Sequence, residues 1–456
     1  MKELRKNITV ILVIFIIMFV LLAGYFLYDV FMYSGRWISS AYNPRLRERR
    51  ASVIPGSIYD VNGVELAGSS YGQRTYSKDT DVRLSTCHVI GDIYGFSPTG
   101  VETTQGAWLL GFNENLFDRI QRVLLSDTAH GRDIKLTIDS GINIEIADMM
   151  GDYKGAAVVL NYKTGEILSM VSLPEFDLKE IDVSQEHGGA DEKSLPNRAL
   201  QGSYPPGELF KVVTAAAAME YLDLVDETLT CEGSIKTEDG TIFCETVHGQ
   251  QTFDEAIQNY CSASLSQLAI EMGESNLKKT AEKLGFNYQF LFGDVVLYSS
   301  ELNISSLTSD YDLAQAAIGQ DYVTVTPMHM AMLYGAIANG GKMMPLKLLA
   351  DIEGVDMDKR SYNLRKSFEY AIAHKLNDIL KADDPIENQE MLLCGVSCEV
   401  EYESEDYDSI TWYAGYSADE NVPYSIALVL EDYDGSTEDA KRIAQEIFKK
   451  IIEDGE

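Results

Sequence analysis

The sequence is poor in basic residues and in histidine. Its 456 residues include 37 lysines and arginines against 71 aspartates and glutamates, which gives a net charge of −34. An acidic surface of this kind repels phosphate, so nucleic acid is excluded as a partner. It also repels anionic lipid, so membrane attachment requires a dedicated segment. The six histidines show no paired ligand spacing, and we predict no metal and no other cofactor.

Cysteine is scarce as well, with six in the whole chain. Outside the cytoplasm such thiols can form disulfides. Cys231 and Cys244 flank a short, turn-rich excursion, and they are the pair that we expect to be bonded. Cys394 and Cys398 lie four positions apart on an expected strand, where their side chains share a face but stand too far apart for a bond without a bend.

The long hydrophobic run of the chain lies at its start. Residues 8–27 are apolar or small apart from one threonine, and a helix of this length crosses a hydrocarbon core of about 30 Å. Lys2, Arg5 and Lys6 precede the run and should stay in the cytoplasm, which places everything after Tyr28 outside. A cleaved signal peptide is the alternative, but its apolar core has about 7 to 15 residues. We predict a single-pass protein of the cell membrane.

The segment at residues 204–211 reads Tyr-Pro-Pro-Gly-Glu-Leu-Phe-Lys and precedes an apolar run at residues 212–219. It resembles the Ser-x-x-Lys region of penicillin-binding proteins, with Glu208 where the serine is expected and Lys211 in the place of the lysine. In that chemistry the serine hydroxyl attacks the substrate carbonyl, and the lysine one helical turn away accepts its proton. A carboxylate is a far weaker nucleophile toward an amide, so this resemblance implies a degenerate acylation site.

A purely structural interpretation of the same two residues is that they form an ordinary pair three positions apart on a solvated helix face. Such a pair is worth a few tenths of a kcal/mol. Two serines are candidates for a substitute nucleophile. Ser275 precedes Lys278 at the same spacing but is expected to cap a helix, and Ser203 is separated from Lys211 by two prolines and a glycine.

Two further segments resemble parts of class B penicillin-binding proteins. Residues 55–67, with a tight turn at Val61-Asn62-Gly63, resemble the box that opens the non-catalytic region. Residues 133–139 and 155–170 resemble the start of the transpeptidase domain, in which helices pack on both faces of a mainly antiparallel sheet. Lys163-Thr164-Gly165 is expected in a hairpin turn there, so it is not the catalytic Lys-Thr-Gly motif.

The family's second motif, Ser-x-Asn, also lacks its chemical residues. The flanking residues 254–259 and 267–273 place the motif at Tyr260-Cys261-Ser262. A frame shifted by two residues gives Ser262-Ala263-Ser264, which restores a hydroxyl but no amide. Neither frame retains the expected serine together with its partner.

The third motif, Lys-Thr-Gly, is expected on an edge strand, where its cation and backbone amides hold the substrate. Counting back from residues 411–416 places it at Cys394, Gly395 and Val396. No lysine or arginine occurs between residues 382 and 431, so no neighbouring base can replace the missing cation.

Residues 317–320, 325–331 and 336–341 are also close to family segments that shape the region behind the site. The resemblance therefore implies three parts: a cytoplasmic stub with a transmembrane helix (residues 1–28), a neck with a small β-rich non-catalytic domain (residues 29–132), and an α+β transpeptidase-like domain (residues 133–456). The short interval between the signatures indicates the subgroup with a short non-catalytic pedestal.

Losses at three separated motifs predict a catalytically inactive member, a pseudoenzyme of cell-wall synthesis. Its expected role is to act as scaffold or regulator beside a polytopic glycan polymerase, with the membrane and peptidoglycan stem peptides as further partners. Two alternatives stay open. The first is an active serine-type D,D-transpeptidase that uses an altered site, and the second is a noncovalent sensor of muropeptides or β-lactams.

Overall fold

The structure is a computed structural model of the whole chain. It describes residues 2–38, 53–112, 129–182, 184–224, 228–290, 292–306, 308–357, 367–383, 393–401 and 407–455.

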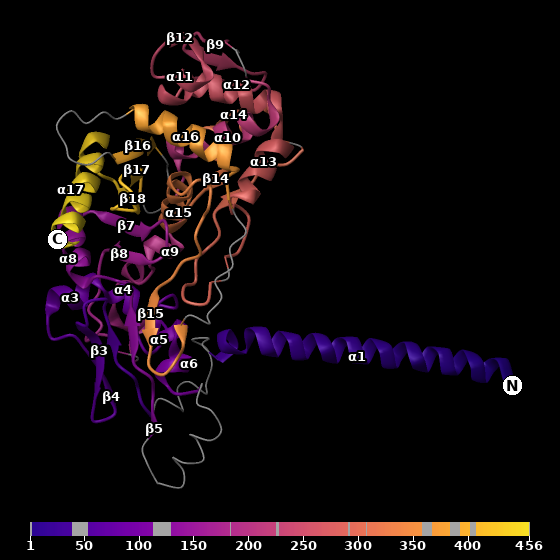
Figure 1. Cartoon of the computed structure of the whole chain (residues 1–456), viewed down its shortest axis with the longest axis vertical. Helices are drawn as coiled ribbons and strands as arrows, with labels where there is room; N and C mark the ends of the chain where they lie inside the picture. Colours follow the sequence, from indigo (N-terminus) through magenta and orange to yellow (C-terminus); the bar gives the residue numbers. More distant parts are fainter. Residues whose placement is uncertain are drawn as a thin grey trace.

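The first element, α1 (Lys2–Ile38), is a continuous helix that stands apart from the rest of the molecule (Figure 1). Its stretch Asn7–Phe26 has a mean hydropathy of 3.0 and is not buried by other parts of the protein. Within the described part of the chain, α1 is the one helix long and apolar enough to cross a membrane. The sequence-based prediction of a long apolar helix at this end is confirmed.

A small sheet forms the lower part of the molecule in Figure 1. Its strand order is β15-β6-β2-β3-β4, with β2 (Ile58–Tyr59) antiparallel to β3 (Glu65–Ser70) and parallel to β6 (Ile134–Leu136). The predicted tight turn joins β2 to β3, and Gly63 there has φ 84°. The remaining strands are β4 (Gln73–Tyr76) and β15 (Leu349–Ile352).

Short elements surround this sheet. They are β1 (Val53–Ile54), β5 (Ala129–His130), α3 (Thr80–Ser85), α4 (Cys87–Ile90), α5 (Val101–Thr104) and α6 (Gly106–Leu109). Because β6 and β15 both belong to the sheet, segments from beyond residue 132 complete it. The predicted domain boundary between residues 132 and 133 lies directly before β6.

The central sheet is antiparallel throughout, in the order β16-β17-β18-β7-β8. The predicted hairpin over residues 155–170 is present, with Lys163-Thr164-Gly165 in its turn. The strands are β7 (Lys154–Asn161), β8 (Ile167–Leu173), β16 (Leu393–Glu401), β17 (Ser409–Ser417) and β18 (Tyr424–Glu431).

Helices cover both faces of the central sheet. On one face α8 (Ser140–Met150) and α17 (Thr437–Gly455) enclose a core that includes Leu428 and Phe448. On the other face α15 (Pro327–Ala338), which is buried along nearly all its length, packs among α9 (Arg198–Gln201), α10 (Lys211–Tyr221) and α16 (Tyr370–Asp383). This arrangement confirms the predicted α+β fold with helices on both faces of an antiparallel sheet.

The remaining elements lie mostly around α10, at the top of Figure 1. They are β9 (Thr228–Cys231), β10 (Ser234–Lys236), β11 (Thr241–Phe243), β12 (Gly249–Thr252), α11 (Phe253–Gln258), α12 (Ser262–Met272), α13 (Glu274–Lys283) and α14 (Asp310–Ala317). Short 3₁₀ turns and bridging strands complete the fold: η1 (Glu186–Gly189), η2 (Glu192–Ser194), η3 (Gly207–Phe210), β13 (Glu301–Leu302) and β14 (Val323–Thr324).

Candidate functional site

Glu208 and Lys211 lie on one continuous helical stretch, because the 3₁₀ turn η3 leads directly into α10. In a 3₁₀ turn, side chains three positions apart are eclipsed, and the Glu208 carboxylate accordingly lies 2.8 Å from Lys211 Nζ. Lys211 opens α10, where the partial positive charge of a helix N-terminus disfavours a cation. The neighbouring carboxylate offsets this cost.

The two members of the pair are exposed to very different degrees. The Lys211 side chain is 2% exposed and the Glu208 side chain 32%. The interpretation of a pair on a solvated helix face is therefore wrong. The apolar run after the tetrad buries this end of the helix, so the lysine points into the protein rather than to solvent.

Lys211 donates hydrogen bonds to three acceptors in the described structure. Besides Glu208 Oε1, they are the backbone carbonyl of Tyr260 at 2.5 Å and Ser262 Oγ at 3.0 Å. An ammonium group has three hydrogens to donate, so these partners use all of its donors. The first two motifs thus meet at one buried cation, although three of their four chemical side chains are replaced.

The two acceptors from the second motif are the first and last residues of the triplet Tyr260-Cys261-Ser262, which leads into α12. Tyr260 has φ 45°, a left-handed backbone conformation, and its carbonyl faces Lys211. Ser264, which stands at the asparagine position of the shifted frame, is fully buried and instead accepts a hydrogen bond from Gln251 at 3.0 Å. The geometry therefore favours the frame at residues 260–262 over the frame shifted by two.

The third motif, predicted at Cys394, Gly395 and Val396, falls on β16, an edge strand of the central sheet. A Cβ atom on Gly207 would lie 2.5 Å from Val400 Cγ2 and 3.3 Å from Cys398 Sγ. The segment of β16 that packs against Gly207, the residue before the tetrad, thus includes Cys398 and Val400, which follow the predicted motif on the same strand.

Cys398 is the thiol nearest to the expected nucleophile position among the described residues. Burial raises its pKa to about 12, and the negative charge of Glu208 adds to the effect. A thiol attacks as its thiolate, so Cys398 is held in an unreactive form. The sequence placed Cys398 on the same expected strand as Cys394, but its position beside Glu208 depends on a contact between distant segments.

The loop that carries Glu208 is held from behind by segments that the sequence also singled out. The amide of Gly207 donates to the carbonyl of Gly319 at 2.9 Å, and Tyr204 exchanges backbone hydrogen bonds with Val325. Trp412 Nε1 donates to the carbonyl of Pro205 at 3.0 Å. These hydrogen bonds hold the loop before Glu208 against three separate parts of the fold.

The other candidate serines lie elsewhere. Ser275 is in the first turn of α13, whose N-cap residue is Gly273, so the prediction that Ser275 caps this helix is wrong. Lys278 donates to the carbonyl of Ile304 instead of pairing with a nucleophile. Ser203 is exposed in the loop before η3.

The predicted disulfide pair is close but not bonded. Cys231 Sγ and Cys244 Sγ lie 3.7 Å apart, and both cysteines are free thiols. The structure adds two partners that the sequence spacing did not reveal, because the fold brings separate element ends together. We call the resulting group the Cys3His cluster, and its members are Cys231, Cys244, His248 and Cys261.

The comparisons with known proteins agree with this architecture. The family model for the penicillin binding protein transpeptidase domain matches residues 155–387. The chain belongs to the penicillin-binding protein transpeptidase family. Its α1 helix and its relatives are consistent with anchoring in a membrane.

Relatives and solved structures of this family extend over most of the chain. Peptidoglycan D,D-transpeptidase PbpA of Mycolicibacterium smegmatis is 26% identical over 375 residues, which cover 74% of this chain and 75% of PbpA. The penicillin G acyl-enzyme complex of penicillin-binding protein A from M. tuberculosis superposes with a TM-score of 0.76 at 22% identity, covering 88% of this chain and 100% of that chain. The D,D-transpeptidase domain of a peptidoglycan glycosyltransferase from Eggerthella lenta gives a TM-score of 0.70 at 25% identity, covering 88% and 99%.

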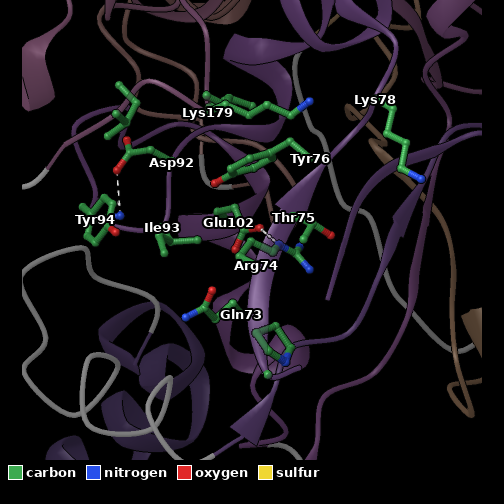
Figure 2. A pocket seen from close by; sticks show the side chains of 14 residues that line it. Gln73, Arg74, Thr75, Tyr76, Lys78, Asp92, Ile93, Tyr94, Glu102 and Lys179 are labelled. Atoms are coloured by element: carbon green, nitrogen blue, oxygen red, sulfur yellow. Dashed lines mark hydrogen bonds and ion pairs between the residues drawn. The ribbon is translucent and has the colours of Figure 1, made fainter. Parts of the chain in front are cut away.

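A separate cavity of about 840 Å³ lies in the small-sheet region of this penicillin-binding protein fold (Figure 2), and Lys211 does not line it. Arg74 and Glu102 form a buried ion pair at its wall, and Arg74 Nη1 also donates to the carbonyl of Gly56 at 2.6 Å. Lys78 and Lys179 line the same cavity. These contacts mainly fix β4 to the neighbouring short helices.

Proposed function

We propose that this chain is a catalytically degenerate penicillin-binding protein that acts in peptidoglycan assembly by binding rather than by acyl transfer. Its partner in this proposal is a polytopic glycan polymerase, which it supports as scaffold or regulator. The proposal rests on the hydrogen bonding of Lys211. All three of its donors are engaged by Glu208, Tyr260 and Ser262.

A general base must have a lone pair and must lie within reach of the proton that it removes. Lys211 as a donor to three acceptors is a buried cation, and the group one turn before it is a carboxylate without a proton to give. Acylation of a carboxylate would produce an anhydride, which water hydrolyses readily. The pair is therefore suited to hold the site together and poorly suited to attack an amide.

An active transpeptidase with an altered nucleophile is less well supported. Cys398 is the thiol beside the site, and its pKa of about 12 keeps it protonated. The edge strand that should supply the third motif's cation has none, since residues 382–431 include neither lysine nor arginine. A noncovalent sensor of muropeptides is the second alternative, but no described contact favours it over the scaffold.

The decisive experiment is labelling of the purified full-length chain in detergent with a fluorescent penicillin, with intact mass as the readout. We expect no adduct on the natural chain. Glu208→Ser is the matched variant, and we expect it to stay unlabelled too because the cation of the third motif is also missing. A stoichiometric adduct on the natural chain, mapped to one residue, would restore the enzyme hypothesis.

The scaffold role needs a test in cells. A strain that carries Lys211→Met in place of the natural chain should grow with normal shape. A strain whose protein lacks residues 1–38 should show the same defect as a strain without the gene. Equal protein levels, checked by immunoblot, are the control. Failure of Lys211→Met at a normal protein level would show that the site itself is needed and would count against a purely architectural role.

A further inference from the structure

The members of the Cys3His cluster come from the ends of four different elements. Cys231 ends β9, Cys244 directly follows β11, His248 directly precedes β12, and Cys261 is the N-cap residue of α12. One potential ligand atom from each residue lies within 4.8 Å of all the others. We propose that this cluster binds one Zn²⁺ ion as a closed tetrahedral site with three thiolate ligands and one imidazole ligand.

The sulfur distances fit this ion. Cys244 Sγ lies 3.7 Å from Cys231 Sγ and 3.7 Å from Cys261 Sγ. With Zn–S bonds of about 2.3 Å, the edge of a regular tetrahedron is about 3.8 Å. The described geometry thus already approaches the spacing of sulfurs around one zinc ion.

The surroundings of the His248 imidazole also fit a metal ligand. His248 Nδ1 is buried and has no hydrogen-bond partner in the described structure. The other ring nitrogen, Nε2, lies 3.1 Å from the hydroxyl of Thr246. Donation from Nε2–H to Thr246 leaves the lone pair on Nδ1, which is how a second-shell group fixes the tautomer of a metal-binding histidine.

Backbone amides support negative charge on each sulfur. Cys231 Sγ accepts from the amide of Gly233 at 3.4 Å, and Cys244 Sγ accepts from the amide of Ala263 at 3.1 Å. The amide of Ser264 lies 3.4 Å from Cys261 Sγ. Such bonds stabilise thiolates, and a soft set of three thiolates with one imidazole selects zinc over calcium or magnesium.

A disulfide would engage only two of the four groups in the Cys3His cluster. Cys244 lies at the same distance from two possible partners, so oxidation could join one pair and would leave the third thiol and the buried His248 Nδ1 without a partner. Zinc binding engages all four groups. It releases up to three thiol protons to solvent and involves no electron transfer, so it needs no oxidant.

Zinc at this position would tie the β9–β12 segment to the start of α12. Cys261 stands between Tyr260 and Ser262, the two residues that hold Lys211 from the second motif. A metal bond on Cys261 would therefore restrain both of these contacts. We infer that the ion is structural, because its four protein ligands leave no open position for a substrate or water.

The test uses the full-length chain in detergent, stripped of metal under reducing conditions and then titrated with Zn²⁺. We expect one zinc per chain by elemental mass spectrometry and a thiolate-to-metal absorption band when Co²⁺ replaces Zn²⁺. Cys244→Ser should abolish stoichiometric binding, while Cys87→Ser should retain it, since Cys87 is a buried free thiol outside the cluster. Thr246→Val should weaken zinc affinity by about 10-fold through loss of the second-shell bond.

Two results would overturn the proposal. One is a natural chain with six free thiols, counted after denaturation, that when folded neither binds zinc nor gives the cobalt band. The other is a chain isolated without reductant whose intact mass and peptide map show a disulfide within the cluster, and which after reduction still takes up no metal. Because the cobalt titration uses the natural chain, the proposal stays testable even if Cys244→Ser does not fold.

Discussion

Lys211 and Glu208 share one ion pair but differ in their access to water, and this difference determines how each tolerates replacement. Glu208→Ala leaves a buried cation with only a carbonyl and a hydroxyl as partners. Removing one partner of a buried pair costs about 3–5 kcal/mol, and we expect a loss of about 3 kcal/mol because Glu208 is partly screened by solvent.

The reverse change provides the matched control. Lys211→Met fills the buried space with an apolar chain of similar length and leaves Glu208, which is 32% exposed, to be solvated. We expect a loss below about 1 kcal/mol. Chemical denaturation of both variants, followed by tryptophan fluorescence, measures the difference. Equal losses would mean that the pair behaves as an ordinary surface pair.

His88 provides a pH-dependent prediction at the same scale. Burial lowers the pKa of His88 to about 4, although its ring nitrogen Nε2 lies 2.7 Å from the carbonyl of Ser194. An unfolded chain has a histidine pKa near 6.5, so the unfolded state binds more protons between these values. The stability contributed by neutral His88 is complete above about pH 6.5 and is lost as the pH falls to about 4, by about 3 kcal/mol in total.

Replacing His88 removes this titration. His88→Gln is expected to lower stability at neutral pH but to reduce the slope of stability against pH between 6.5 and 4. Denaturation midpoints of the two chains across this range measure the slope. A variant with the same slope as the natural chain would assign the acid sensitivity to other groups.

The sequence predicted the residue pair but not its environment. Spacing by three residues correctly placed Glu208 and Lys211 on one helix face, because this is local geometry. Burial of Lys211 depends on residues 260–262, which are distant in the chain. No local pattern reports such a contact. The Cys3His cluster escaped prediction for the same reason, since its ligand spacing follows the paths of β9 to β12.

At the scale of elements, close packing between η3 and the loop after α14 is the feature most sensitive to an added side chain. Gly319 has φ 78°, and a Cβ atom there would lie 2.1 Å from the carbonyl oxygen of Gly207. Both the backbone strain and the clash oppose Gly319→Ala. We expect a loss of about 3 kcal/mol or more, because the backbone neighbour cannot move aside as a flexible side chain could.

Gly63 is the matched control for this prediction. It has φ 84° in the turn between β2 and β3, and no atom lies within 4 Å of the position that an added Cβ would occupy. Gly63→Ala should therefore cost about 1 kcal/mol from backbone strain alone. Thermal denaturation of both variants separates the two effects. Similar losses at the two positions would show that the contact between Gly319 and Gly207 is less tight than described.

Elements with strong local signals were predicted well, and positions along them less well. Alternation and turn residues located the hairpins β2–β3 and β7–β8. Which residues of β16 pack against Gly207 could not be predicted, because the register of an edge strand against η3 is determined by tertiary packing. The assignment of β6 and β15 to the small sheet likewise depends on pairing between distant segments.

At the scale of the whole molecule, the orientation of α1 across a membrane is a sequence-based prediction that can be tested directly. Lys2, Arg5 and Lys6 precede the apolar stretch, whereas five arginines lie within residues 36–50 on its other side. Basic residues near both ends compete for the cytoplasmic side. The acidic bulk of the chain, with its net charge of −34, has little influence, because long domains are translocated largely regardless of charge.

We expect a C-terminal alkaline phosphatase fusion, which is active only outside the cytoplasm, to be active, and a C-terminal fluorescent protein that folds only in the cytoplasm to be dark. Replacing Lys2, Arg5 and Lys6 together by glutamate removes the basic residues on the predicted cytoplasmic side. The arginines at residues 36–50 then favour the inverted orientation, so phosphatase activity should fall and fluorescence should rise. An active phosphatase fusion that is unaffected by this change would mean that the charges before α1 do not determine its orientation, and a natural chain with a bright fluorescent fusion would place the penicillin-binding fold in the cytoplasm.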